Sequence, residues 1–327
     1  MNILGLWVTE LSSGFSFEQV NLLPALKRMG HKVSVFPLVN KFINFDRNIG
    51  RLSNLDSILL DILKFIKPDL LITLIYHRVI EPITYKYITE NTPITTLLIC
   101  GDDEKYFTEN CDSPTKEYSP FFDNVWTTYN PAKKWHEDIG CRNVIYAGYH
   151  ANEKIYKKKK IDKDTDVAFC GSMNTSRIHV MNKIMMADIK IKVYGNGWRD
   201  NPYSSLTTDE YVNLMNRTKV NINISEDEID GKIYPQIKAR DFEVPMAGGF
   251  LLTTANPALE EYYKIGKEIE VYTDYDELIN KIKFFIKHDS IRERIAQAGH
   301  KRALKDHTTT KRLSYVFENL KMKGENG

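Results

Sequence analysis

The stretch QIKARDFEVPMAGGFLLT, residues 236–253, decides the fold. The spacing of its apolar residues predicts a helix over 235–246 that stops at Gly248 and Gly249, because glycine is a poor helix former. The apolar run that follows, 250–253, is short, which is typical of a buried strand. A helix that leads directly into a buried strand is one step of an α/β fold with a parallel sheet.

The same alternation continues in both directions along the chain. Short apolar runs predict further strands at Asn2–Val8, Lys32–Pro37, Leu70–Ile75, Thr95–Cys100, Val125–Thr128, Val144–Tyr146, Val167–Cys170, Ile191–Tyr194 and Val220–Ile224. Amphipathic stretches predict helices at Phe17–Met29, Ser57–Lys67, Glu81–Thr89, Pro131–Ile139, Arg177–Met186, Thr207–Asn216, Tyr275–His288, Ile291–Leu304 and Thr309–Met322. Strands that alternate with helices indicate parallel sheets, so the predicted fold is α/β with two Rossmann-like domains.

The length and one charged segment divide the chain. Its 327 residues suffice for two domains of ~150 residues each. The segment Lys157–Asp164 is almost wholly charged and predicts a solvated linker, with a polybasic contact to RNA or a membrane as the alternative. Two open α/β sheets predict a cleft in which ligands bind at the carboxyl ends of the strands. The expected division is a first domain over 1–155, a linker over 156–165, a second domain over 166–305, and a C-terminal helix over 306–327 that packs back on the first domain.

Composition excludes several classes of protein. Lys and Arg number 45 against 43 Asp and Glu, and this balance gives no basic field for nucleic acid. No apolar run reaches the ~18–20 residues of a membrane span. The first residues lack a basic leader, so we expect a cytoplasmic protein without a signal peptide. The four cysteines are widely spaced without a C-x-x-C pattern, which predicts buried free thiols rather than a structural zinc site.

The helix in the opening stretch carries polar residues on one face. Gln236, Arg240 and Glu243 lie at positions i, i+4 and i+7, so they share that face. If the start of the helix faces the cleft, its free N–H groups and Lys238 could hold an anion such as a pyrophosphate. The Glu deeper in the helix could accept hydrogen bonds from a ribose diol. The alternative is an ordinary surface pair of Arg240 and Glu243.

Several motifs of the second half resemble a known family. These motifs are RDFEVPMAGGFLLT (240–253), NPALEEYYKIGKE (256–268), DYDEL (274–278), RERIAQAG (292–299), His307-Thr308, FCGS (169–172) and VYGNGW (193–198). Together they are similar to the nucleotide-sugar domain of GT-B glycosyltransferases, and most similar to the CgeB-like (spore-maturation) branch of group 1. The resemblance covers about residues 165–315 with good specificity. The first half matches only in outline, chiefly at 122–127 and 140–146.

The resemblance implies roles for residues near the donor. Glu243 falls where the family's Glu binds the nucleotide ribose, whereas Pro235 stands where many relatives carry a Glu that contacts the donor sugar. Gly171 and Ser172 with Arg177 resemble the turn that meets the donor phosphates. Glycine lets the main chain approach closely, and arginine offers a two-pronged fork to phosphate oxygens.

Further donor-side residues are predicted with open alternatives. Lys238 and Arg240 are candidate cations for the diphosphate, or else solvated helix residues. The Gly-x-Gly at 195–197 lacks the third glycine of a dinucleotide fingerprint, so it fits a turn beside the nucleotide base. The alternative is a plain turn with Trp198 packed in the core. The remaining predicted donor-binding residues are Tyr194, Gly195, Trp198 and Gly248.

The first half must supply the acceptor side. Relatives place a glycine loop near the donor where Gly14 follows the first strand. His77 follows the third strand and could exchange a proton near neutral pH. Asp102 and Asp103 follow the fourth strand and could deprotonate an acceptor hydroxyl, or merely cap a turn. His150 would line the cleft if the linker starts there.

The prediction is therefore a metal-independent glycosyltransferase without a cofactor. Its donor is a nucleotide-diphosphate sugar, such as a UDP-sugar, and its acceptor is a glycan, a protein or a small molecule. No D-x-D motif lies in a context that suggests a donor-bound ion, and basic side chains with helix dipoles can neutralise a leaving diphosphate. A nucleotide-sugar epimerase or hydrolase and a non-catalytic nucleotide-binding protein are the alternatives.

Overall fold

The computed structural model describes residues 1–10, 16–39, 55–75, 78–107, 114–198, 206–229 and 232–324. Their contacts divide the chain into two units. Unit 1 comprises the described parts of 1–148 together with 312–324, and unit 2 comprises those of 149–311. The charged segment Lys157–Asp164 belongs to unit 2, where the Lys159 backbone N–H donates to Asn216 Oδ1 at 2.7 Å.

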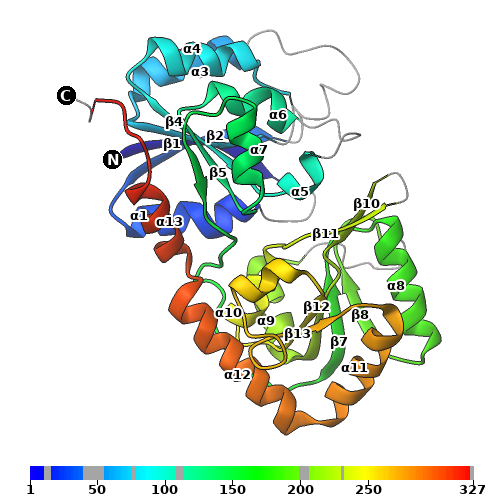
Figure 1. Cartoon of the computed structure of the whole chain (residues 1–327). Helices are drawn as coiled ribbons and strands as arrows, with labels where there is room; N and C mark the ends of the chain where they lie inside the picture. Colours follow the sequence, from blue (N-terminus) through cyan, green and yellow to red (C-terminus); the bar gives the residue numbers. More distant parts are fainter. Residues whose placement is uncertain are drawn as a thin grey trace. The chain divides into compact units, whose positions relative to one another are not determined.

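The described part of unit 1 contains a parallel sheet of six strands in the order β2-β1-β3-β4-β5-β6 (Figure 1). With β1 between β2 and β3, the connections run in opposite directions from β1 and place helices on both faces. The strands are β1 (Asn2–Glu10), β2 (Lys32–Val39), β3 (Leu70–Leu74), β4 (Thr95–Cys100), β5 (Asn124–Thr127) and β6 (Val144–Tyr146).

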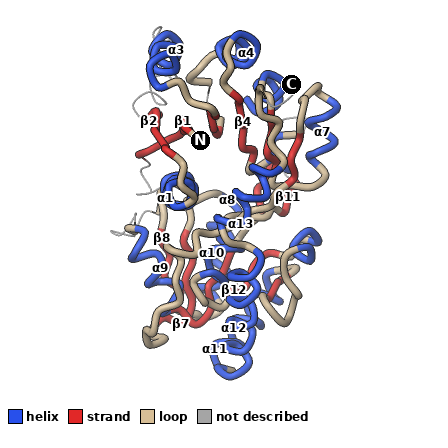
Figure 2. Tube along the Cα trace, turned by 90° about the vertical axis from the view of Figure 1, so that its left-hand side faces the viewer, coloured by secondary structure: helices blue, strands red, loops and turns tan. Residues whose placement is uncertain are grey.

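The two faces of this sheet can be followed along β1. Leu4 and Leu6 pack in the core cluster that includes α3 (Leu55–Ile66) and α4 (Pro82–Asn91). Ile3 and Trp7 point the other way, to α1 (Leu23–Arg28) and α13 (Thr309–Glu318). Figures 1 and 2 show α3 and α4 together on one side of the strands. Gly5 lies against the Trp7 ring, where a Cβ would collide with the indole.

The C-terminal residues complete the second face of unit 1. Leu313, Val316 and Leu320 are buried in the same cluster as Ile3 and Trp7. The backbone N–H of Lys321 donates to Asn124 Oδ1 at 2.9 Å, which ties this segment to β5. The other described helices of unit 1 are α5 (Asp103–Tyr106), α6 (Pro114–Tyr118) and α7 (Ala132–Asp138), with a π-helical turn at Glu18–Leu22 and a 3₁₀ turn at Ser119–Phe121.

The described part of unit 2 contains a second parallel sheet, of five strands in the order β13-β12-β9-β7-β8. Its strands are β7 (Thr165–Cys170), β8 (Ile191–Tyr194), β9 (Thr218–Asn223), β12 (Leu251–Thr254) and β13 (Glu270–Tyr272). Its helices are α8 (Thr175–Met186), α9 (Thr208–Arg217), α10 (Arg240–Met246), α11 (Tyr275–Lys287) and α12 (Asp289–Asp306), with a 3₁₀ turn at Pro257–Glu261. Figure 1 shows α8 and α11 beside the strands of this sheet, and their apolar residues share one core cluster with β7, β9 and β12.

The predicted α/β fold with two parallel sheets is confirmed. The short elements β13, α5 and α6 were not among the predicted ones, and the segment before α10 differs from the prediction. The expected helix over 235–246 begins only at Arg240, because the segment before it is extended: Gln236 N–H donates to the Ser225 carbonyl at 2.6 Å. The expected polar loop contains an antiparallel hairpin, β10 (Glu226–Ile229) with β11 (Lys232–Pro235). Asp230-Gly231 between these strands is a hairpin signal in the sequence. Among the described residues, no helix has the length and apolar character of a membrane span.

Candidate functional site

Most of the predicted donor-side residues gather at one edge of the unit 2 sheet. Parallel strands β7, β8, β9 and β12 all end at this edge, so the segments that follow them lie close together. Gly171 N–H donates to the Tyr194 carbonyl at 2.8 Å, and Trp198 Nε1 donates to the Gly171 carbonyl at 2.9 Å. Arg240 also reaches this point, because a Cβ on Gly171 would collide with its guanidinium. The sequence-predicted turns after β7 and β8 therefore form one structure.

Two arginines bring positive charge to this edge through one aromatic ring. The guanidinium carbon of Arg177 lies 5.4 Å from the centre of the Phe169 ring, and that of Arg240 lies 4.9 Å from it. Such cation–π contacts hold a guanidinium in place. Arg177 Nη1 donates to the Ser172 carbonyl at 2.7 Å, and Arg240 Nη1 donates to Asn223 Oδ1. The structure thus brings together two of the cations that the sequence predicted separately.

The turn after β8 has a packing role. Gly195 has φ +127°, which favours glycine, and a Cβ there would collide with the Gly171 carbonyl. The Trp198 ring lies edge-on to the Phe169 ring, with 6.3 Å between their centres. This is the alternative of a turn with a packed tryptophan, which the sequence left open. Contact of Tyr194, Gly195 and Trp198 with a nucleotide base stays a prediction.

Glu243 is the acceptor of two buried tyrosine hydroxyls. Tyr156 Oη donates to its Oε1 at 2.7 Å, and Tyr211 Oη donates to its Oε2 at 3.1 Å. The residue is 6% exposed, and this burial raises the pKa of the carboxyl group despite the Tyr156 hydrogen bond and the nearby Arg240 charge. Both oxygens are thus held, and a ribose diol would join or replace the tyrosine hydroxyls. The ribose role of Glu243 stays a prediction.

A carboxylate that the sequence did not single out fixes the entrance to α10. Asp241 is fully buried and accepts from Asn223 Nδ2 at 2.6 Å, Thr253 Oγ1 at 2.7 Å and the Lys238 N–H at 2.9 Å. Burial raises the pKa of Asp241, and the hydrogen bonds oppose that rise. The carboxylate therefore joins β9, β12 and the start of α10, so Lys238 is placed near Arg240 by its backbone.

Two buried polar side chains beside this entrance have no internal partner. Gln236 and Ser225 are each 1% exposed, and Gln236 Oε1, Gln236 Nε2 and Ser225 Oγ make no hydrogen bond within the described residues. The Gln236 N–H to Ser225 carbonyl bond makes these residues neighbours. Leaving such groups unpaired costs ~1–3 kcal/mol each. The pair therefore indicates a place where a ligand supplies the missing partners. In the sequence, the signal for this place was the position of Gln236 on the polar face of the predicted helix.

Gly248 lies apart from these residues. It ends α10 with φ +77° and its N–H donates to the Pro245 carbonyl at 2.9 Å. Because it precedes β12, it stands at the amino edge of the sheet, opposite the edge where Gly171 lies. Its role here is that of a helix-ending glycine, and the structure gives no support to a donor contact.

The candidate acceptor residues of unit 1 have different environments. Asp102 is half-buried and precedes α5 at the carboxyl end of β4. Asp103 is fully buried: its Oδ2 accepts from Thr127 Oγ1 at 2.5 Å and lies 3.2 Å from His136 Nε2. Burial alone would lower the pKa of His136, but the interactions with Asp103, Cys100 and Cys141 together outweigh it and raise this pKa to about 12. Asp103 is thus enclosed inside unit 1, which leaves Asp102 as the better placed of the two to act as a base.

The other first-half predictions lie outside this network. Gly14 and His77 are outside the described residues, so their roles stay predictions. His150 is 1% exposed and its Nδ1 lies 2.8 Å from Thr309 Oγ1, both within unit 2. It is therefore a buried, hydrogen-bonded histidine in this structure.

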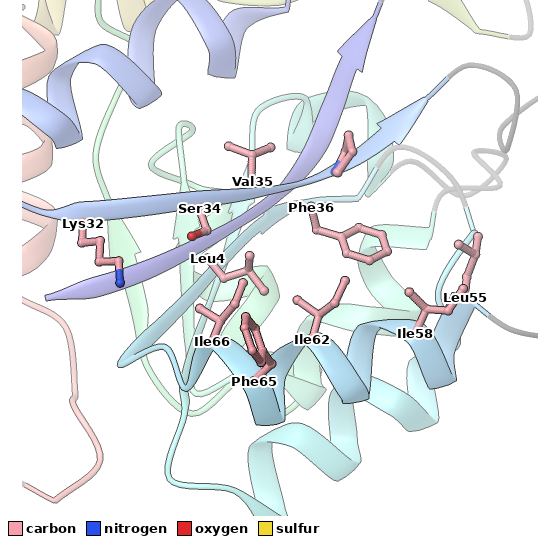
Figure 3. Close-up of a pocket in the computed structure, with 11 residues that line it drawn as sticks. Leu4, Lys32, Ser34, Val35, Phe36, Leu55, Ile58, Ile62, Phe65 and Ile66 are labelled. Carbon is pink, nitrogen blue, oxygen red and sulfur yellow. The ribbon is translucent and has the colours of Figure 1, made fainter.

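Unit 1 also has an apolar cavity that belongs to none of these clusters. It measures about 700 Å³ and lies between β2 and α3, where Phe36, Ile62 and Phe65 line it (Figure 3). Lys32 is the charged residue among its described lining residues. An apolar space with so little polar chemistry is poorly suited to hold a charged nucleotide.

Comparisons with known proteins bear on the family and on the fold. Residues 177–318 match a family model described as glycosyl transferase-like. No curated protein sequence matches the chain.

Solved structures share the fold over nearly the whole chain. Sucrose-phosphate synthase from Thermosynechococcus elongatus has a TM-score of 0.71 at 10% identity, covering 98% of this chain and 99% of that one. A glycosyltransferase from Rickettsia africae has a TM-score of 0.68 at 12% identity, covering 100% and 99%. HepE from Anabaena in complex with UDP-glucose has a TM-score of 0.70 at 12% identity, covering 98% and 99%. Such identities show the fold, which is that of the GT-B glycosyltransferases.

Proposed function

We propose that this chain, which carries a glycosyl transferase-like domain on a GT-B fold, transfers a sugar from a nucleotide-diphosphate sugar to an acceptor hydroxyl. The observation that carries the proposal is the pair of guanidinium groups of Arg177 and Arg240, held on the Phe169 ring beside Gly171. A diphosphate needs positive charge and close main-chain approach at one point, and the carboxyl edge of the unit 2 sheet offers both.

The proposed donor site divides by chemistry. Arg177 and Arg240 bind the diphosphate oxygens, with Lys238 as an additional cation. Gly171 and Ser172 let the main chain approach the same phosphates. The residues that would bind the sugar and ribose hydroxyls are neutral or negative, so they form a separate group.

Hydroxyl recognition falls to the residues that follow β9 and those on α10. Gln236 and Ser225 supply the unpaired amide and hydroxyl that a sugar hydroxyl would satisfy. Pro235 has no side-chain group for the donor sugar, unlike the Glu that many relatives carry there. Gln236 and Ser225 would make the contact with the donor sugar instead. Glu243 binds the ribose diol and shares it with the Tyr156 and Tyr211 hydroxyls that already contact the carboxylate.

The chemistry follows from these placements. The bond between the sugar's anomeric carbon and the diphosphate oxygen breaks, and the acceptor oxygen bonds to that carbon. Negative charge develops on the leaving diphosphate, where Arg177 and Arg240 stabilise it without a metal ion or a cofactor. Asp102, half-buried at the end of β4, is the proposed base that takes the acceptor proton.

Three finer points complete the proposal. HepE was solved with UDP-glucose, which supports a UDP-sugar as the donor here. The motifs of 240–299 support membership of the CgeB-like branch. The described cysteines, Cys100, Cys141 and Cys170, are free thiols, which supports a cytoplasmic location. Fractionation of the producing cells would test this location.

The test is a binding screen followed by a transfer assay. Melting temperature is measured with nucleoside diphosphates and their sugars, because a ligand of the folded state alone raises it. The expected result is stabilisation by one diphosphate family, unchanged when Mg²⁺ is omitted, and transfer of labelled sugar to a member of an acceptor panel. Donor hydrolysis or epimerisation without acceptor would favour the alternative enzymes, and an absence of any diphosphate response would refute the donor site.

A further inference from the structure

Three side chains with metal-binding atoms meet inside unit 1. They are Cys100 at the end of β4, Asp103 at the start of α5 and His136 in α7, and they are 3%, 0% and 0% exposed. One ligand atom of each, the sulfur, a carboxylate oxygen and an imidazole nitrogen, lies within 4.8 Å of the other two. Because the residues come from separate elements, only the fold brings them together.

The ligand atoms lie close enough for a single small ion to draw them together. Zinc binds sulfur at ~2.3 Å and nitrogen or oxygen at ~2.0–2.2 Å, so neighbouring ligands of a tetrahedral site are ~3.3–3.7 Å apart. His136 Nε2 and Asp103 Oδ2 are already 3.2 Å apart. A thiolate, an imidazole and a carboxylate form a mixed ligand set that zinc accepts.

The surroundings supply the outer contacts that metal ligands usually have. His136 Nδ1, the nitrogen on the far side of the ring, lies 3.3 Å from Ser119 Oγ and 3.8 Å from Cys141 Sγ. Thr127 Oγ1 donates to Asp103 Oδ2 at 2.5 Å. Hydrogen bonds of this kind fix the ring and the carboxylate of a metal site in their binding orientation.

A separate observation points to a missing partner. Asp103 Oδ1 is buried and accepts no hydrogen bond from the described residues, although a buried carboxylate oxygen is costly to leave unpaired. A cation at the meeting point of the three side chains would satisfy this oxygen. Binding through both oxygens would also give the ion a fourth ligand atom.

From these observations we propose that Cys100, Asp103 and His136 form a buried structural site for a divalent transition metal of the zinc class. The ion replaces the protons of the Cys100 thiol and of His136 Nε2, which leave as it binds. It then holds the end of β4, α5 and α7 together directly beside Asp102. The proposal is independent of the donor site in unit 2, and the ion takes no part in sugar transfer.

The first test is elemental analysis of the full chain, purified without a polyhistidine tag and without chelator. We expect close to one zinc per chain in the wild type and a near-complete loss in Cys100→Ser and His136→Gln. Cys170→Ser removes a thiol of unit 2 and is the matched control, which should keep its zinc. Equal metal content in Cys100→Ser and the wild type would overturn the assignment.

A second measurement stands even if the variants fold poorly. Chelator-treated wild type is titrated with Co²⁺, and a thiolate-to-cobalt absorption band is expected, together with a rise in melting temperature on adding Zn²⁺. A wild-type chain that is purified without metal and gains neither the band nor stability would show that Asp103 and His136 are instead a simple proton-bridged pair.

Discussion

The carboxyl edges of the two sheets show how similar scaffolds handle charge differently. In unit 1, Asp103 and His136 lie against each other and are fully buried, so Asp103 Oδ2 pairs with the imidazole inside the core. In unit 2, Arg177 and Arg240 stack on Phe169, and the neighbouring Gln236 has no internal partner. The unit 1 edge thus encloses its charged pair and one unpaired carboxylate oxygen, Asp103 Oδ1, whereas the unit 2 edge combines two arginines with an unpaired amide.

The comparison of the two edges shows that burial alone does not identify a ligand site. Asp241 and Glu243 in α10 and Asp103 in α5 are all buried carboxylates. Asp241 and Glu243 have partners for both oxygens, and these partners tie elements of unit 2 together. The informative groups are those whose hydrogen-bonding capacity is unused, because an evolved fold rarely leaves such groups unsatisfied.

The largest expected effect concerns the two arginines. Arg177→Ala should raise the dissociation constant for the nucleoside diphosphate about 10- to 100-fold, because a charge-assisted hydrogen bond contributes ~1.5–3 kcal/mol. Arg142→Ala is the matched control: this arginine of unit 1 is about half exposed and pairs only loosely, 3.7 Å from Asp123. Isothermal titration with UDP and related diphosphates measures both. Equal affinities for the two variants would remove the arginine pair from the donor site.

A smaller effect is expected at Gln236, where a substitution should lower donor affinity without lowering stability. Gln236→Met keeps the size but removes the unpaired amide, so the melting temperature should hold or rise while donor affinity falls about tenfold, in line with one or two lost hydrogen bonds of ~0.5–1.5 kcal/mol. Asn216→Leu is the control, because this buried amide donates to the Val212 and Lys157 carbonyls and should lose stability without affecting the donor. A stability loss in Gln236→Met would show that its amide has an internal role.

The pH dependence of unit 2 stability should show the buried carboxyl Glu243. Its pKa is raised in the folded chain, chiefly by burial, so the folded state holds its proton to higher pH than the unfolded state does. Stability must therefore fall as pH rises through the window above the ordinary value of 4.5. Glu243→Gln should flatten this fall, as measured by melting temperature against pH. An unchanged slope in the variant would assign the fall to other groups, such as Asp241.

The smallest effect is expected at Glu277, and its sign is the reverse. Hydrogen bonds from Lys281 and Thr273 lower the pKa of Glu277 to about 2. The stability that this carboxylate contributes is present above its ordinary value of 4.5 and is lost as pH falls toward about 2. The Glu277 side chain is partly exposed, so solvent screening keeps the effect small. On acidification, Glu277→Gln should therefore begin to unfold at a slightly higher pH than the wild type. Onset at the same or a lower pH would contradict the assignment.

The regular elements were predictable because each depends on nearby residues. The strands Thr95–Cys100 and Val144–Tyr146 have the predicted bounds, and the helix predicted from Thr207 begins there, where Thr207 and Glu210 form a capping box. The start of α10 was missed because Gln236 continues the β10–β11 hairpin and its N–H pairs with the Ser225 carbonyl instead of forming a helical turn. A helical pattern of apolar residues does not show that a hairpin bond competes with the helix.

The sequence by itself determined the alternation of strands and helices, the motifs of the second half and the types of residue that follow each strand. Only the tertiary structure decided which of those residues meet. Arg177 and Arg240 contact one aromatic ring, and Gly248 lies at the opposite edge of that sheet. Asp103 is buried against His136, and the Gln236 amide has no partner among the described residues. The two differ because periodic burial depends on residues that are close in the sequence. The partners of a side chain depend instead on how crossover connections bring distant strand ends together.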